Sequence, residues 1–114
     1  MPKVLAIVGA TATGKSALAL HLAEHLDSEI VNADALQVYR GLDIGTGKPS
    51  AADRARAPHH LLDILAPDQP LTAGAFATLA RAAIADIQSR NRLPIVVGGS
   101  GLYVRALFSG ITST

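Results

Sequence analysis

Short aliphatic runs alternate with longer segments of helical periodicity along this chain. Residues 4–8 form a continuous apolar run followed by glycine, which is typical of a strand buried on both faces of a parallel sheet. Over residues 15–26 the apolar positions recur every third or fourth residue. Leu18, Leu22 and Leu26, with alanines beside them, predict the apolar face of an amphipathic helix.

The middle of the chain predicts two more strands separated by a loop. Residues 29–33 have the pattern of a strand that ends at Asp34, and residues 60–64 that of a third strand. The segment between them is rich in glycine and proline, which is typical of a loop. Within it, residues 51–57 predict a short helix with Ser50 as its N-cap, because a serine side chain can bond to the free N–H groups of the first helical turn.

The last third of the chain predicts a long helix, a strand and a shorter helix. Thr72 is suited to cap the long helix. The expected core face of that helix comprises Phe76, Leu79, Ala80, Ala83, Ile84 and Ile87. Residues 93–97 form a short apolar run closed by the glycine-rich string 98–101, and residues 102–108 predict a helix that Gly110 stops. This alternation predicts an α/β fold with a parallel sheet flanked by helices.

Composition narrows the class of protein. The chain has 114 residues, the length of one domain or a piece of one, and a formal net charge of only +1. A hydrophobic fraction of 49% can supply a core, and the absence of cysteine excludes disulfides and thiolate metal sites. No apolar stretch approaches the ~20 residues of a membrane-spanning helix. We therefore expect a soluble, cytoplasmic protein without the basic surface of an autonomous nucleic-acid binder.

A glycine-rich string between the first predicted strand and the first predicted helix fits the P-loop pattern. It consists of Gly9, Ala10, Thr11, Ala12, Thr13, Gly14, Lys15 and Ser16. Glycines let backbone N–H groups turn toward phosphate oxygens, and the helix amino end adds partial positive charge. Lys15 supplies a full charge, and the Ser16 hydroxyl can bind a phosphate-bound Mg²⁺. The string predicts diphosphate or polyphosphate binding, and the alternative is an ordinary glycine-rich turn.

Two further segments follow predicted strands, and parallel strands deliver their C-terminal loops to one edge of a sheet. Asp34 could be a general base, a Mg²⁺ ligand or a helix cap. The string 98–101 could contact a substrate through its backbone and hydroxyl or be only a tight turn. We expect these segments and the P-loop to meet in one crevice.

Other polar residues fit structural roles better. His21 and His25 could share a metal ion, but a third ligand is not near them in the sequence, so a solvated helix face is expected. The pair 59–60 follows a proline and is expected to be structural. Arg54 and Arg56 could touch phosphate, but arginines in such a loop usually face water.

The sequence resembles the bacterial tRNA dimethylallyltransferase family in ordered segments at 9–16, 32–49, 58–63 and 97–103. The string Asp-Ile-Gly-Thr-Gly-Lys-Pro at 43–49 is more discriminating than the P-loop. Members of that family transfer a dimethylallyl group from its diphosphate to N6 of the adenine just 3′ of the anticodon. The resemblance implies a P-loop NTPase-like parallel sheet flanked by helices, with dimethylallyl diphosphate and tRNA as partners and Mg²⁺ as cofactor.

The resemblance also implies a role for each matching residue. Lys15, Thr11 and the loop backbone would hold the diphosphate leaving group, with Ser16 acting through Mg²⁺. Asp34 would accept a proton from the adenine N6 amine as that amine attacks the allylic carbon. The positions that match tRNA contacts are Asp34, Ala35, Leu36, Gln37 and Ser100.

The sequence departs from the family pattern at two positions and covers only part of a family member. Ala35 stands where the family usually has serine, and Ser100 where it usually has threonine. The resemblance covers the first third of a family member, so residues 1–114 would be the N-terminal part of a P-loop α/β catalytic domain. The helical tRNA-binding insertion and the C-terminal part would be absent, which leaves the activity of this piece open. A monomer is favoured for the full-length protein.

Other functions remain open at this point. One is an isopentenyltransferase that acts on free adenine nucleotide, although the string 45–49 favours the tRNA type. Another is a small P-loop kinase in which Asp34 would bind a phosphoryl acceptor, although residues 40–60 make a poor basic lid. The last is a truncated module that binds phosphate without turnover.

Overall fold

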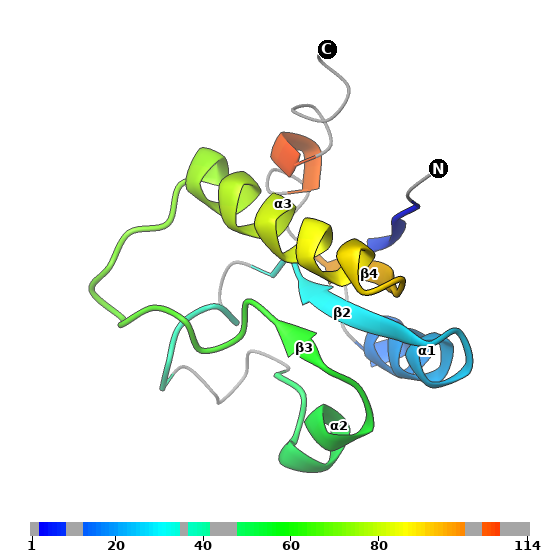
Figure 1. Ribbon diagram of the computed structural model, residues 1–114. Coiled ribbons are helices and arrows are strands. Elements are labelled where there is room, and N and C mark those ends of the chain that lie inside the picture. The colour runs from blue at the N-terminus through cyan, green and yellow to red at the C-terminus, as the bar shows by residue number, and fades with distance from the viewer. Residues whose placement is uncertain (1–2, 9–12, 35–36, 42–47, 100–103, 108–114) are drawn as a thin grey trace.

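The computed structural model of the chain describes residues 3–8, 13–34, 37–41, 48–99 and 104–107. They form a four-stranded parallel sheet with α3 on one face and α1 on the other (Figure 1). The strands are β1 (Leu5–Val8), β2 (Ser28–Asn32), β3 (His59–His60) and β4 (Leu93–Gly98). The helices are α1 (Thr13–His25), α2 (Ala51–Arg56) and α3 (Ala73–Ser89). The predicted α/β architecture is confirmed.

The strand order is β1-β4-β2-β3, and every neighbouring pair is parallel. Val8 at the end of β1 pairs with Gly98 at the end of β4, and Asn32 at the end of β2 pairs with Val97. The carboxyl ends of these three strands therefore lie at one edge of the sheet. Because β4 separates β1 from β2, residues distant in the sequence are brought together at that edge.

The sheet is covered on both faces, which explains the continuous apolar runs of its strands. Successive residues of β2 and β4 point to opposite faces. The cluster on the α3 side comprises Val31, Ala33, Phe76, Ala80, Ile84, Ile87, Val96 and Leu107. The cluster on the α1 side comprises Ala19, Leu20, Ala23, Ile30, Ala57 and Ile95.

The predicted caps of α2 and α3 are confirmed. The Asp53 backbone N–H donates to Ser50 Oγ at 3.1 Å, and the Asp53 carboxylate accepts from the Ser50 N–H to complete a capping box. The Ala75 N–H donates to Thr72 Oγ1 at 3.0 Å. These side chains satisfy backbone donors that have no partner within the first helical turn.

The predicted apolar faces of the helices are partly wrong. Leu18 and Leu26 of α1 are 48% exposed, and α1 packs through Ala19, Leu20 and Ala23 instead. Leucines spaced four apart drift by about 40° around a helix per step, and of the three Leu22, the middle one, packs against the cluster on this side of the sheet. The alanines allow the helix backbone to lie close to the strands. Similarly, in α3 Leu79 is 39% exposed, whereas the neighbouring Ala77 and Ala80 are buried.

The predicted strand at 60–64 is also wrong in extent, because β3 ends at His60. Leu61 and Asp63 have φ values of 67° and 56°, and a left-handed residue cannot continue an extended strand. A bulky residue such as Leu61 in this region costs of the order of 1–3 kcal/mol, which the surrounding structure must offset.

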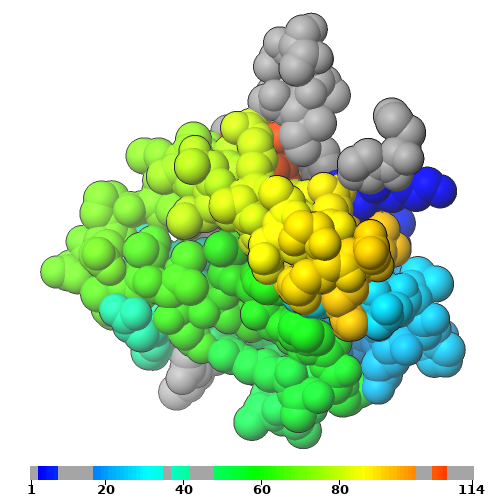
Figure 2. All heavy atoms as spheres, in the orientation of Figure 1, coloured from blue at the N-terminus to red at the C-terminus, as the bar shows by residue number. Residues whose placement is uncertain are grey.

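Packing helps to hold that segment in place. Leu61 and Leu71 pack against the apolar cluster on the α3 side. The space-filling view shows the segment between β3 and α3, in green and yellow-green, directly beside α3 (Figure 2). Residues 104–107 of the predicted last helix are helical, and the rest of that prediction, with Gly110, lies outside the described residues.

Candidate functional site at the carboxyl edge of the sheet

The predicted P-loop is described only in part. Thr13, Gly14, Lys15 and Ser16 form the first turn of α1, as a P-loop between β1 and α1 requires. The side chains of these four residues lie outside the described part of the structure, as do Gly9, Ala10, Thr11 and Ala12. The backbone therefore gives the amino end of α1, and the contacts of the phosphate cradle remain a prediction.

Asp34 lies beyond the end of β2 at this edge. The Ala33 N–H donates to the Val97 carbonyl at 2.8 Å, so the sheet pairing continues one residue past β2. A Cβ atom on Gly98 would lie 2.4 Å from the Ala33 carbonyl oxygen. The expected meeting of the Asp34 segment with the glycine-rich string after β4 is therefore observed at Gly98, whereas Ser100 lies outside the described residues.

Asn32 is a residue of this edge that the sequence analysis missed as a candidate. Its Oδ1 accepts a hydrogen bond from the Asp34 N–H at 3.0 Å, and its Nδ2 donates to the Asp34 carbonyl at 3.1 Å. The same Nδ2 donates to the Leu61 carbonyl at 3.0 Å. Asn32 is buried, and the signal that could have found it is an amide residue at the end of a predicted strand, two positions before an aspartate.

Gln37, one of the predicted tRNA contacts, is buried, with 8% of the residue exposed. Its backbone N–H donates to the Asp34 carbonyl at 3.2 Å, and its own carbonyl accepts from the Asp63 N–H at 3.3 Å. With Leu20, Pro49 and other residues it lines a mainly apolar cavity of about 40 Å³. Ala35 and Leu36, which also match tRNA contacts, lie outside the described residues.

A charged cluster joins two of the motif segments. Lys48 is buried, and its Nζ donates to the Tyr39 carbonyl at 2.5 Å and to Asp63 Oδ1 at 2.6 Å. Arg54 Nη1 donates to Asp63 Oδ2 at 2.7 Å. The hydrogen bonds from Lys48 and Arg54 lower the pKa of Asp63, because both favour the carboxylate form. This cluster fixes the segment after β3 against the residues that precede α2.

The expectation that Arg54 and Arg56 face water is wrong in part. Arg54 is one-third exposed and is bound to Asp63. Arg56 makes two hydrogen bonds with Glu24 of α1, at 2.6 and 3.2 Å. The sequence could not reveal this pairing, because α1 and α2 approach each other only in the folded chain.

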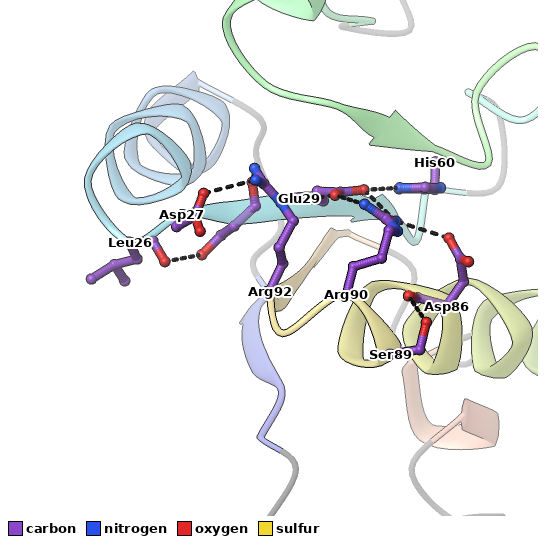
Figure 3. A network of polar contacts seen from close by, with 9 residues as sticks. Leu26, Asp27, Glu29, His60, Asp86, Ser89, Arg90 and Arg92 are labelled. Carbon is purple, nitrogen blue, oxygen red and sulfur yellow. Dashed lines mark hydrogen bonds and ion pairs between the residues drawn. The ribbon is translucent and has the colours of Figure 1, made fainter.

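A second charged network lies at the amino end of β2, away from Asp34 (Figure 3). Glu29 is 2% exposed and binds Arg90 and Arg92, which lie just before β4. Its Oε1 also accepts a hydrogen bond from His60 Nε2 at 2.7 Å. Hydrogen bonds from Arg90, followed by His60, lower the pKa of Glu29 to about 2 in spite of burial. His59 Nδ1 contacts the Ala57 carbonyl at 2.8 Å, so both histidines have the structural roles that were predicted.

The described residues offer no ready-made metal centre. Among them, no group of three His, Cys, Asp or Glu side chains is arranged to hold an ion. His21 and His25 are exposed on α1, and His25 Nδ1 lies 2.7 Å from the His21 carbonyl, in agreement with the predicted solvated face. Within the same residues, none of the helices is long and apolar enough to cross a membrane.

Comparisons with known proteins point in one direction. A protein-family model described as IPP transferase matches residues 37–114. The tRNA dimethylallyltransferase of Anaeromyxobacter dehalogenans is 60% identical over 109 residues, which is 96% of this chain and 36% of that protein. The chain thus spans about a third of the length of this curated relative.

Solved structures agree with the sequence comparison. The full-length tRNA isopentenylpyrophosphate transferase of Bacillus halodurans has a TM-score of 0.92 and 43% identity, and the match covers 100% of this chain and 38% of that one. A eukaryotic dimethylallyltransferase acting on tRNA has a TM-score of 0.89 and 36% identity, over 94% of this chain and 27% of that one. At these identities the likeness extends beyond general topology.

Proposed function

This chain belongs to the IPP transferase family, and from that membership we propose that it forms the part of a tRNA dimethylallyltransferase that binds the diphosphate and carries the general base. The reaction would transfer a dimethylallyl group from dimethylallyl diphosphate to N6 of the adenine 3′ of the anticodon. The names of its relatives support transfer to tRNA. A tRNA substrate also implies a cytoplasmic location.

The observation that carries the proposal is the position of Asp34 at the edge where α1 begins. Pairing of β1 and β2 with β4 brings the amino end of α1 and the Asp34 segment to the same edge of the sheet, at the carboxyl ends of the strands. A helix amino end favours an anion, and a carboxylate favours a nearby proton donor. A diphosphate leaving group and an attacking amine need those two environments within one site.

The proposed chemistry divides between two groups of residues. An exocyclic adenine amine is a weak nucleophile, so Asp34 would take its proton as the new C–N bond forms and the C–O bond to diphosphate breaks. Lys15, Thr11 and the backbone of residues 9–16 would stabilise the charge that develops on the departing diphosphate. Ala35, Leu36, Gln37 and Ser100 would contact the tRNA.

Mg²⁺ would be held by the Ser16 hydroxyl together with diphosphate oxygens. An all-oxygen donor set with few protein ligands is typical of Mg²⁺ bound to a phosphorylated substrate. The ion would neutralise charge on the leaving group. Ser16 lies in the first turn of α1, which is the position that this role requires.

The test is a transfer assay with radiolabelled dimethylallyl diphosphate and undermodified tRNA, using the complete gene product that contains residues 1–114. We expect label in tRNA, and Asp34→Ala should abolish transfer while diphosphate binding stays nearly unchanged. Asp68→Ala, in an exposed loop, is the matched control and should transfer at the wild-type rate. Transfer of the ATP γ-phosphate to a metabolite, with no label in tRNA, would instead identify a kinase.

A further inference from the structure

Asn32 contacts both backbone groups that flank the Cα atom of Asp34. Its Oδ1 receives the Asp34 N–H, and its Nδ2 donates to the Asp34 carbonyl. Fixing the N–H and the C=O of one residue restricts both of its backbone dihedrals. The direction of the Asp34 Cα–Cβ bond, and with it the origin of the carboxylate, is therefore restricted by a neighbouring side chain.

The Asn32 amide is itself held without freedom to rotate. The backbone of Asn32 lies in the sheet, where it pairs with Val97, and only 4% of the residue is exposed. Its second Nδ2 contact is the carbonyl of Leu61, the residue with a φ of 67°. Rotating the amide by 180° would set an oxygen against two carbonyls and a nitrogen against an N–H, so the hydrogen bonds select one orientation.

Contact with Leu61 connects Asp34 to the segment that follows β3. That segment contains Asp63, which is bound to Lys48 and Arg54. On its other side, Ala33 is pressed against Gly98 of β4. Asp34 thus follows a backbone that is fixed by β4 from one direction and by the Asn32 amide from another.

We infer that Asn32 is a positioning residue, which sets the direction of the Asp34 carboxylate for proton transfer and links it to the left-handed Leu61 turn. This inference rests on the proposed function of Asp34 as the general base. Asn32 acts through Asp34, so its loss should lower the rate of the chemical step and leave substrate binding nearly intact. Misplacing a reacting group by about 1 Å can lower a rate about 100-fold.

The experiment measures transfer from dimethylallyl diphosphate to tRNA by the complete gene product, for Asn32→Ala and for the control Ser28→Ala. Ser28 is also buried in β2, but at its other end, where its hydroxyl donates to the Leu26 carbonyl at 3.2 Å. We expect Asn32→Ala to lower kcat about 10- to 100-fold, with KM for both substrates within about threefold of the wild type. Ser28→Ala removes one buried hydrogen bond, so it should lower the melting temperature and leave kcat unchanged.

A double-mutant cycle separates positioning from general destabilisation. If Asn32 acts through Asp34, the loss of transfer caused by Asn32→Ala should be smaller in an Asp34→Glu background, where the longer side chain already displaces the carboxylate, than in the wild type. Equal losses in both backgrounds, or equal kcat values for Asn32→Ala and Ser28→Ala, would overturn the inference.

If Asn32→Ala does not fold, Asn32→Ser replaces it, because a serine hydroxyl can accept the N–H two residues on but cannot make all three hydrogen bonds. An intermediate kcat is then expected, and a wild-type kcat would overturn the inference. Absence of transfer by the wild-type protein would overturn the proposed function and this inference together, and it is recognised from the wild type alone.

Discussion

Gly98 and Ala33 approach each other so closely that a Cβ atom on residue 98 would lie 2.4 Å from the Ala33 carbonyl oxygen and 2.7 Å from the Ala33 Cβ. Glycine is required here by lack of space, since β4 and the segment after β2 are in direct backbone contact. The contact lies immediately before Asp34, so packing and the proposed chemistry depend on the same few atoms.

Gly98→Ala should therefore destabilise the protein by about 1–3 kcal/mol, because the added methyl group must push two backbones apart. Urea unfolding measures the loss, and transfer activity should fall as Asp34 shifts. Gly74→Ala is the control: Gly74 lies in α3 with open space around it, so alanine should stabilise the helix by up to about 1 kcal/mol. Equal stability of Gly98→Ala and the wild type would contradict the close contact.

The Glu29 network should give the protein an acid-sensitive component of stability. The folded pKa of about 2 lies below the ordinary value of 4.5, so the contribution is complete above pH 4.5 and is lost as the pH falls toward 2. A depression of that size corresponds to about 3 kcal/mol. Glu29→Gln should thus be less stable than the wild type at pH 7, with a difference that shrinks between pH 4.5 and 2. A difference independent of pH would argue against this ionised network.

Asp63→Asn should destabilise the segment after β3 by about 2–3 kcal/mol, because it removes the negative charge that binds the buried Lys48 ammonium and Arg54. Chemical denaturation measures this change. Glu24→Gln removes the exposed ion pair with Arg56 and should have little effect, since side chains of this exposure are screened by water. Similar effects of the two substitutions would contradict the distinction between these ion pairs.

Thr72→Ala should cost about 1 kcal/mol through loss of the cap on α3, because the Ala75 N–H loses its acceptor. Thr78→Ala is the matched substitution within the same helix. Thr78 is exposed and its hydroxyl donates back to the Gly74 carbonyl, so alanine there should be neutral or slightly stabilising. Thr72→Ala should therefore melt at a lower temperature than Thr78→Ala, and the opposite order would exclude the capping role.

Local patterns predicted most elements correctly, and the errors have specific causes. The caps at Ser50 and Thr72 were predictable because a helix start depends on residues adjacent in the chain. Leu18 was assigned to a buried face because periodicity identifies apolar positions without showing which of them a sheet will cover. The third strand was predicted too long because a positive φ at Leu61 depends on contacts distant in the sequence.

The sequence by itself determined the alternation of strands and helices, the P-loop string before the first helix and the place of Asp34 just after a strand, because each of these depends on neighbouring residues. Only the tertiary structure decided that β4 lies between β1 and β2, that Gly98 contacts Ala33, and that Asn32 joins Asp34 to Leu61. These relationships arise when strands from distant parts of the chain pair and bury polar groups that must then bond to one another. Such partners are chosen by three-dimensional packing, which spacing along a single chain does not specify.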